Sequence, residues 1–290
     1  MALFSSLTPV IIAVICICLA VLWSSIKKET GERKVKTEER TSSRRWADED
    51  LGDETELMVD ENAGDFLEKD LEVQHIPYSA PRYSEDEMIC RANKFYQQMN
   101  ARRSIRFISE EMVPREVIDS IIRTAGTAPS GAHTEPWTFV VIEDPETKHQ
   151  IRAIIEEEEE INYKKRMGKK WVSDLKQMRT NWIKDYLDAA PYLILVFKQT
   201  YGILPTGKKT HYYNEISVSI SCGILLAALQ NAGLVTVTTT PLNCGPRVRV
   251  ILGRPANEKL LLLLPVGYPA EGATVPDFKR KPLDEIMVFV

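Results

Sequence analysis

The chain has 290 residues, with 37 Lys and Arg against 41 Asp and Glu and a net charge of −4 at pH 7. This near balance argues against a strongly basic nucleic-acid-binding protein, so no nucleic acid is expected as a partner. The hydrophobic share of 44% excludes a wholly disordered chain, and five cysteines are too few for a disulfide scaffold.

The first 26 residues contain no charged side chain, and Lys27 and Lys28 follow them directly. A stretch of this length can span a bilayer of about 30 Å at about 1.5 Å per residue. A cleaved signal peptide is the alternative, but the stretch lacks a basic start and a small-residue cleavage pattern. We therefore expect residues 1–26 to be a retained transmembrane helix in the plasma membrane or a vesicle membrane. The basic flank favours a cytosolic position for the rest of the chain.

Residues 27–80 are predicted to form an acidic, mostly disordered linker, because acidic residues dominate there and large apolar ones are sparse. Residues 81–290 are predicted to form one α/β catalytic domain. Its first helix begins at the S-x-x-E capping box of Ser84 and Glu87, and a second begins at Pro114 and ends near Gly126. The remaining expected elements are strands at 139–142, 193–197, 235–240 and 260–266, and a helix at 216–232.

The helix at 216–232 is apolar nearly all round, so it belongs in a core or between subunits. No Gly-rich loop of the P-loop or dinucleotide-binding type is present. A nicotinamide cofactor would therefore not be held by a Rossmann half.

Two groups of residues suit an anionic ligand. In the segment Arg102 to Arg106, alternation would place Arg102, Ser104 and Arg106 on one side of an extended chain. Guanidinium groups bind phosphate oxygens in a bidentate fork, although a basic surface turn is the plainer interpretation. Arg280, in a late basic cluster, could add another phosphate contact or be solvated surface.

Two further segments could contact a flat ligand. The loop from Ala128 to Trp137 consists of small residues, so its backbone can approach a ligand closely, or it is a tight connection only. Thr238, Thr239 and Thr240 follow a buried strand, where ligands of α/β folds often lie. Threonine is also simply common in strands.

The segment 151–188 reads as two polar helices around Met167 and Gly168. Glu156 to Glu160 are five consecutive acidic residues, and four of them are interpreted as solvated. Glu159 and Tyr163 share a helical face by their i, i+4 spacing, and Lys184 is expected on the following helix. A carboxylate, a phenol and an ammonium group that converge would complement a zwitterionic amino acid. We expect the segment to be a mobile lid that orders on substrate binding.

In their order along the chain, RRSIR, APSGAHTEPW, the apolar helix, TTTP and the late Arg resemble the FMN-dependent nitroreductase-like superfamily over Ser84 to Val290. Longer stretches resemble most closely the members that dehalogenate iodotyrosines: RRSIRFI, TAPSGAHTEPWTFVV, EEEEINY, NWIKDYL, HYYNEISVSI and LVTVTTTPLNCGP. The resemblance implies an α+β, three-layer α/β/α-like fold, an intertwined homodimer and FMN at the subunit interface.

The resemblance also implies roles for the residues. FMN would be bound by Arg102, Arg103, Ser104, Ile105, Arg106, Ser130, Thr238, Thr239, Thr240 and Arg280, with one of the threonines near the flavin N5. Glu159 would bind the substrate ammonium, Lys184 and Tyr163 its carboxylate, and the Ala132 N–H its phenolate oxygen. No metal is implied.

The implied reaction is reductive removal of iodide from mono- and diiodotyrosine by reduced FMN, for iodide salvage in thyroid hormone metabolism. Electrons would come ultimately from NADPH, directly or through a separate reductase. Two alternatives remain open at this point: a general NAD(P)H-dependent nitro or quinone reductase, and a membrane-tethered flavin-binding protein without catalytic activity. A generalist reductase has no use for a Glu and a Lys that bind an amino acid.

Overall fold

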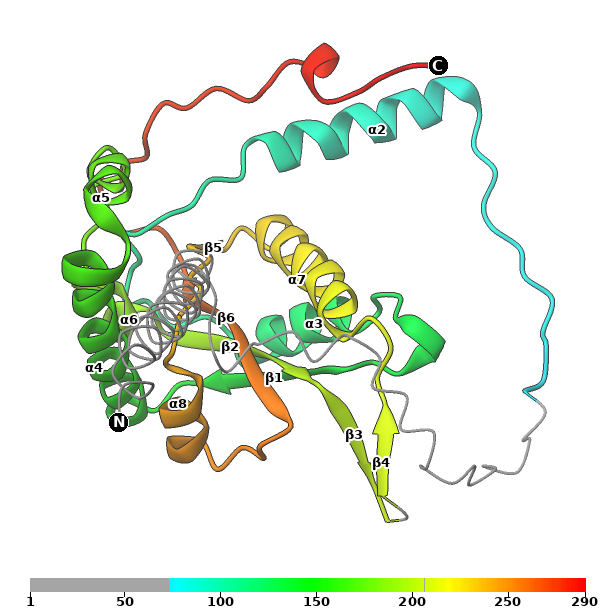
Figure 1. Ribbon diagram of the computed structural model, residues 1–290. Helices are drawn as coiled ribbons and strands as arrows, with labels where there is room; N and C mark the ends of the chain where they lie inside the picture. Colours follow the sequence, from blue (N-terminus) through cyan, green and yellow to red (C-terminus); the bar gives the residue numbers. More distant parts are fainter. Residues whose placement is uncertain (1–72, 206) are drawn as a thin grey trace, which may run out of the picture. The chain divides into compact units, whose positions relative to one another are not determined.

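The computed structural model describes residues 73–205 and 207–290, and its architecture can be followed in Figure 1. The helices are α2 (Glu85–Asn100), α3 (Arg115–Ala125), α4 (Pro145–Ile161), α5 (Gly168–Lys176), α6 (Tyr186–Ala189), α7 (Asn214–Asn231) and α8 (Gly245–Ile251), with a π-helical turn at Asn162–Arg166 and 3-10 turns at Gly131–His133 and Leu283–Glu285. The strands are β1 (Trp137–Ile142), β2 (Tyr192–Gln199), β3 (Tyr201–Leu204), β4 (Gly207–Thr210), β5 (Val235–Thr236) and β6 (Glu258–Gly267).

A four-stranded sheet in the order β1-β2-β6-β5 forms the centre of the domain, and each neighbouring pair is antiparallel. Strand β2 lies between β1 and β6, and all its residues from Tyr192 to Lys198 are buried. Because side chains alternate along a strand, Tyr192, Ile194 and Val196 enter one core, and Leu193, Leu195 and Phe197 enter the other.

Helices cover both faces of this sheet. Apolar side chains of α3 and α7 fill the first core, and α3 packs against α7. Apolar side chains of α4, α6 and α8 fill the second core. The described domain therefore has the expected α+β character, with helical layers on either side of a sheet.

Most expected elements are confirmed. Ser84 caps α2, because its hydroxyl accepts a hydrogen bond from the Glu87 amide at 3.3 Å. The apolar runs at 139–142, 193–197 and 260–266 lie within β1, β2 and β6, and the apolar helix is α7. Pro114 is the residue before the first turn of α3 rather than its first helical position, since its ψ is 134°.

The strand expected at 235–240 is shorter than predicted. Strand β5 ends at Thr236, and one further bridge joins Thr239 to Leu263 of β6. The register is the same on both sides of the interruption. Thr236 pairs with Val266, and Thr239, three residues later in the chain, is bridged to Leu263, which is three residues earlier on β6. The interruption therefore affects only Val237 and Thr238, and Thr238 is exposed.

Large apolar side chains remain exposed on α2, on α7 and in the C-terminal segment. None of the residues of α2 is buried, and Phe95 is 58% exposed. Ile216 and Ile220 of α7 are 61% and 42% exposed, while Val218 and Cys222 on the same helix are buried. Exposed apolar faces of this extent are typical of a protein–protein interface.

No helix among the described residues is long and apolar enough to cross a bilayer. The predicted anchor at 1–26 and most of the predicted linker lie outside the described part of the chain. Residues 73–84 are described and form neither helix nor strand.

Replacing Ser221 by Ala is expected to lower the free energy of unfolding by about 1 kcal/mol, because a buried carbonyl loses a hydrogen-bond donor. The Ser221 hydroxyl is fully buried on α7 and donates to the Ala125 carbonyl of α3 at 2.7 Å. Urea unfolding monitored by circular dichroism measures the change. Ser120→Ala, at an exposed position of α3, is the matched control and should change stability much less.

Candidate active site

The segment from Arg102 to Arg106 runs beside the edge of the sheet. Ser104 forms a parallel bridge with Thr236, and the Ile105 amide donates to the Thr236 carbonyl at 3.0 Å. The expected extended backbone is therefore present at this point. Since four residues of extended chain span roughly 13 Å, the two ends of the segment have different neighbours.

Arg102, Arg103 and Arg280 come together at the first end. An Arg280 Nη2 donates to the Arg102 carbonyl at 2.9 Å, and Arg103 donates to the Pro276 carbonyl. Burial, followed by the charges of Arg280 and Arg103, lowers the pKa of Arg102. None of the three forms an ion pair with another residue in the described part of the chain. A multivalent anion would neutralise this cluster.

Glu159, Tyr163 and Lys184 come together beyond the other end of the segment. The Lys184 Nζ lies 3.7 Å from a Glu159 carboxylate oxygen and 5.6 Å from the centre of the Tyr163 ring. It also donates to the Asn181 carbonyl. Lys184 is only 6% exposed, so its ammonium group is held in a mostly desolvated site.

Burial and two neighbouring charges shift the pKa of Lys184. Burial lowers the pKa of Lys184 and the Arg106 charge lowers it further, whereas Glu159 raises it. The Arg106 charge also acts to lower the pKa of Tyr163 and of Tyr186. This guanidinium therefore lies near Glu159, Tyr163 and Lys184 rather than with Arg102. An anionic group that entered here would meet two cations, Lys184 and Arg106.

Aromatic side chains surround Tyr163. Its ring is 4.7 Å from the Trp171 ring and 5.9 Å from the Trp182 ring, with edge-on geometry in both pairs. Burial, followed by the nearby Glu159 charge, raises the pKa of Tyr163 to about 12. The phenol is therefore neutral and available as a hydrogen-bond donor at pH 7.

This pKa shift predicts a loss of stability at alkaline pH. The folded chain keeps the Tyr163 proton up to about pH 12, whereas the unfolded chain releases it near pH 10. The stabilisation is complete below pH 10 and is lost as the pH rises towards 12. Urea unfolding at pH 9 and pH 11 should thus show a smaller fall in stability for Tyr163→Phe than for the unsubstituted chain. Tyr96→Phe, at an exposed position of α2, should behave like the unsubstituted chain.

The loop from Ser130 to Glu135 has an unusual backbone. Ala132, His133 and Glu135 have φ values of 49°, 51° and 46°, the left-handed region that non-glycine residues rarely adopt. A Cβ on Gly131 would lie 2.8 Å from the Tyr212 carbonyl oxygen, so the loop approaches that segment closely. The Ser130 hydroxyl accepts from the Glu135 amide at 3.0 Å. Ala132 is exposed.

The three candidate threonines differ in their contacts. The Thr239 hydroxyl donates to the Leu263 carbonyl at 2.8 Å, so this hydroxyl is already used as a donor. Thr238 and Thr240 are exposed. A hydroxyl that donates to a ligand at this edge would therefore belong to Thr238 or Thr240.

Two predictions about the lid segment are wrong. Lys184 does not lie on a helix, because α5 ends at Lys176 and α6 begins at Tyr186. The Asn181 side chain accepts from the Ile183 amide at 2.7 Å, a local turn that competes with helix formation. The expected break between helices is present, since Gly168 has a φ of 79° after the π-helical turn.

The second error concerns the acidic run. Glu156 and Glu158 are not solvated, since their side chains are 24% and 16% exposed and pair with Arg152 and Arg166. Glu157 and Glu160 pair near the surface with Arg247 and Lys164. The i, i+4 spacing of Arg152 and Glu156 was the available signal for the first of these pairs.

The chain is similar to known proteins in sequence and in fold. The model of the Nitroreductase family matches residues 99–268. Iodotyrosine deiodinase from Danio rerio is 65% identical over the full length of both chains, and iodotyrosine deiodinase 1 from Homo sapiens is 63% identical over 98% of this chain and 99% of its own. A crystal structure of oxidized iodotyrosine deiodinase bound to FMN and 3-iodo-L-tyrosine superimposes with a TM-score of 0.58 and 31% identity, over 65% of this chain and 96% of that chain.

Proposed function

The chain belongs to the nitroreductase family, and from that premise we propose that it is an FMN-dependent oxidoreductase that deiodinates mono- and diiodotyrosine to tyrosine. Each turnover replaces one carbon–iodine bond by a carbon–hydrogen bond. The reaction consumes two electrons and one proton and releases iodide, which it makes available for salvage. The relatives named iodotyrosine deiodinase, 63–65% identical to this chain, support that activity.

The observation that carries the proposal is the convergence of Glu159, Tyr163 and Lys184. Glu159 offers a carboxylate for the α-ammonium of the substrate, and Lys184 offers an ammonium for its α-carboxylate. Tyr163, neutral at pH 7, can donate a hydrogen bond to the same carboxylate. The burial of Lys184 strengthens these charge-assisted contacts, because little water competes for the ammonium group.

The residues present fit FMN. Arg102, Arg103 and Arg280 are guanidinium donors without a carboxylate partner among the described residues, which suits a phosphate dianion. Ser104, Ile105, Arg106 and Ser130 would hold the rest of the cofactor, and a Thr238 or Thr240 hydroxyl would donate to the ring nitrogen N5. Bound FMN supplies the electrons of the reaction.

The protein would contribute orientation and charge to the reaction. Ala132 is an exposed residue with a left-handed backbone, and its amide would bind the phenolate oxygen and fix the halogenated ring. Glu159 and Lys184 would hold the opposite end of the substrate, so that the ring has one position. The electrons would derive from NADPH, directly or through a separate reductase.

An absorbance titration tests the activity and the cofactor together. The purified protein should be yellow, lose its flavin absorbance when reduced, and regain it on addition of diiodotyrosine with stoichiometric release of iodide. A protein that turns over nitroarenes but not iodotyrosines would instead be a general reductase. A colourless protein that does not take up FMN would be neither.

We also propose that the chain works as a homodimer with FMN at the subunit interface. The exposed apolar residues of α2 and α7, including Phe95, Ile216 and Ile220, support this assembly, because a partner would remove them from water. Sedimentation equilibrium of the FMN-bound protein should give twice the chain mass. A monomer at micromolar concentration would contradict the proposal.

The segment 151–188 is proposed to include a lid that orders on substrate. In support, α5 has no buried residue, and from Asn162 to Asn181 only Asn162, Tyr163 and Met167 are buried. Few apolar contacts therefore hold this part against the domain. Hydrogen exchange should slow in residues 162–181 when 3-iodo-L-tyrosine is added. Equal protection with and without ligand would exclude a lid.

Residues 1–26 are proposed as a membrane anchor, residues 27–80 as a linker and residues 81–290 as a catalytic domain on the cytosolic side of the plasma membrane or a vesicle membrane. The uncharged sequence of 1–26 and the lysines that follow it support this topology. The full chain should stay in the membrane fraction after alkaline carbonate extraction. A variant that lacks residues 1–26 should be released.

A further inference from the structure

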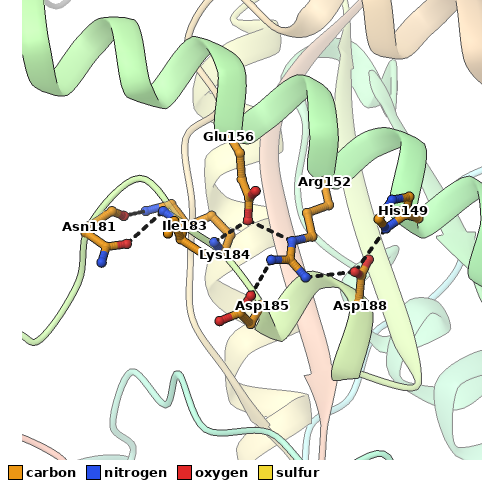
Figure 2. Close-up of polar contacts among 8 residues, drawn as sticks. All are labelled: His149, Arg152, Glu156, Asn181, Ile183, Lys184, Asp185 and Asp188. Atoms are coloured by element: carbon orange, nitrogen blue, oxygen red, sulfur yellow. Dashed lines mark hydrogen bonds and ion pairs between the residues drawn. The ribbon is translucent and has the colours of Figure 1, made fainter.

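A network of polar side chains connects α4 to the chain segment that carries Lys184 (Figure 2). Arg152 is its centre and donates to Glu156 at 2.7 Å, to Asp188 at 2.8 Å and to Asp185. His149 extends the network through a 3.1 Å contact with Asp188. The Arg152 side chain is 20% exposed, so these contacts are partly shielded from solvent.

Glu156 makes a second contact that the other glutamates of the acidic run do not make. Its Oε1 accepts a hydrogen bond from the Lys184 backbone amide at 2.6 Å, and the same oxygen accepts from Arg152 Nε. Glu159 lies one turn further along α4 and faces the Lys184 ammonium group at 3.7 Å. One side of α4 therefore holds both the backbone and the side chain of Lys184.

The other hydrogen bonds of the segment around Lys184 are local ones, such as those to Asn181, and do not join it to α4. Between Asn181 and Asp185 only Lys184 is buried, and the segment is neither helix nor strand until α6 begins. Lys184 also has a lowered pKa through burial and the Arg106 charge, so its ammonium form depends on its distance from Glu159. A shift of the backbone at Lys184 would change that distance directly.

We propose that Glu156, held in place by Arg152, is a positioning residue for the amino-acid end of the substrate. It fixes the backbone of Lys184, and through it the ammonium group that binds the substrate carboxylate. Glu156 thereby favours ligands that carry an α-amino acid over ligands that offer the halogenated ring alone. This inference rests on the proposed function and adds a residue that acts through Lys184 without touching the substrate.

The test compares two ligands that share the ring and differ in the amino acid, 3-iodo-L-tyrosine and 2-iodophenol. The full chain with FMN bound is used, and the dissociation constant and kcat/KM are measured for each ligand. Glu156→Gln keeps the shape of the side chain and removes the charge that holds Arg152. It should raise the dissociation constant of 3-iodo-L-tyrosine by about tenfold, because a charge-assisted hydrogen bond is weakened. The values for 2-iodophenol should change less than twofold.

Two controls separate positioning from general damage. Glu157→Gln removes an acid from the same helix at a side chain that is 59% exposed and pairs with Arg247, and it should change neither ligand. In a Lys184→Gln background, Glu156→Gln should weaken 3-iodo-L-tyrosine binding less than twofold further, because both changes act on one contact.

Arg152→Lys provides a second route to the same answer if Glu156→Gln does not fold. It keeps the charge and removes the forked geometry, so 3-iodo-L-tyrosine binding should weaken selectively by about threefold. An equal loss for both ligands, no loss for either, or a failure of both variants to unfold cooperatively with FMN bound would overturn the inference. Absence of iodide release from the unsubstituted chain would instead overturn the proposed function.

Discussion

Replacing Lys184 by Gln is expected to raise the dissociation constant of 3-iodo-L-tyrosine by about a hundredfold, since truncating one side of a buried charge pair commonly costs 2–5 kcal/mol. The substitution removes the cation that meets the substrate carboxylate. It also leaves Glu159, whose side chain is 16% exposed, without its nearest cation. Both effects weaken binding, and neither involves the arginine cluster.

Flavin content and ligand binding, measured on the same sample, distinguish a loss of substrate binding from a loss of FMN. Lys184→Gln should retain its full FMN absorbance while the fluorescence titration with 3-iodo-L-tyrosine shifts to higher concentration. Lys165→Gln, an exposed position in the same lid segment, is the control and should bind the ligand normally. If affinity is unchanged in Lys184→Gln, Lys184 is not part of the substrate site.

Replacing Arg102 by Gln is expected to weaken FMN binding by about a hundredfold, because a guanidinium–phosphate contact is charge-assisted on both sides. The same substitution should not destabilise the FMN-free protein. Burial, followed by the charges of Arg280 and Arg103, lowers the pKa of Arg102, and like charges at this end of the segment repel one another when no anion is bound. Removing one of them should therefore leave the melting temperature of the FMN-free protein unchanged or slightly higher.

Calorimetric titration with FMN and thermal unfolding of the FMN-free protein provide the two measurements. The affinity of the unsubstituted chain should also fall with added salt more steeply than that of Arg102→Gln. Arg123→Gln, at an exposed position of α3, is the charge-matched control. A destabilised FMN-free protein with unchanged FMN affinity would assign Arg102 to the fold instead.

Local sequence patterns predicted most of the long elements of the domain, but not α8, β3 or β4. The run from Tyr192 to Phe197 is continuously apolar because both faces of β2 are covered. One side of α7 is apolar because it packs against α3, whereas Ile216 and Ile220 on the same helix remain exposed. The end of β5 could not be predicted, because the interruption at Val237 depends on pairing with β6, about 30 residues later in the chain.

The candidate site was likewise predictable only where the residues are close in the sequence. The spacing of Glu159 and Tyr163 on one helix predicted that they would share a face, and the structure places Lys184 beside them. The contact between Glu156 and the Lys184 backbone joins positions 28 residues apart, and no local pattern indicates it. From the sequence alone, a run of acidic residues is interpreted as solvated. The three-dimensional structure is needed to show which cations pair with it.

The left-handed backbone at Ala132, His133 and Glu135 has a consequence for the thermodynamics of ligand binding. Each of these residues opposes folding by about 1 kcal/mol or more, because a Cβ crowds the adjacent carbonyl in this conformation. That cost is met once, when the chain folds and the packing around Gly131 imposes the shape. A glycine-rich loop would instead lose conformational entropy each time a ligand binds. Because the strained loop is already ordered before binding, that entropy loss does not weaken its affinity for the ligand.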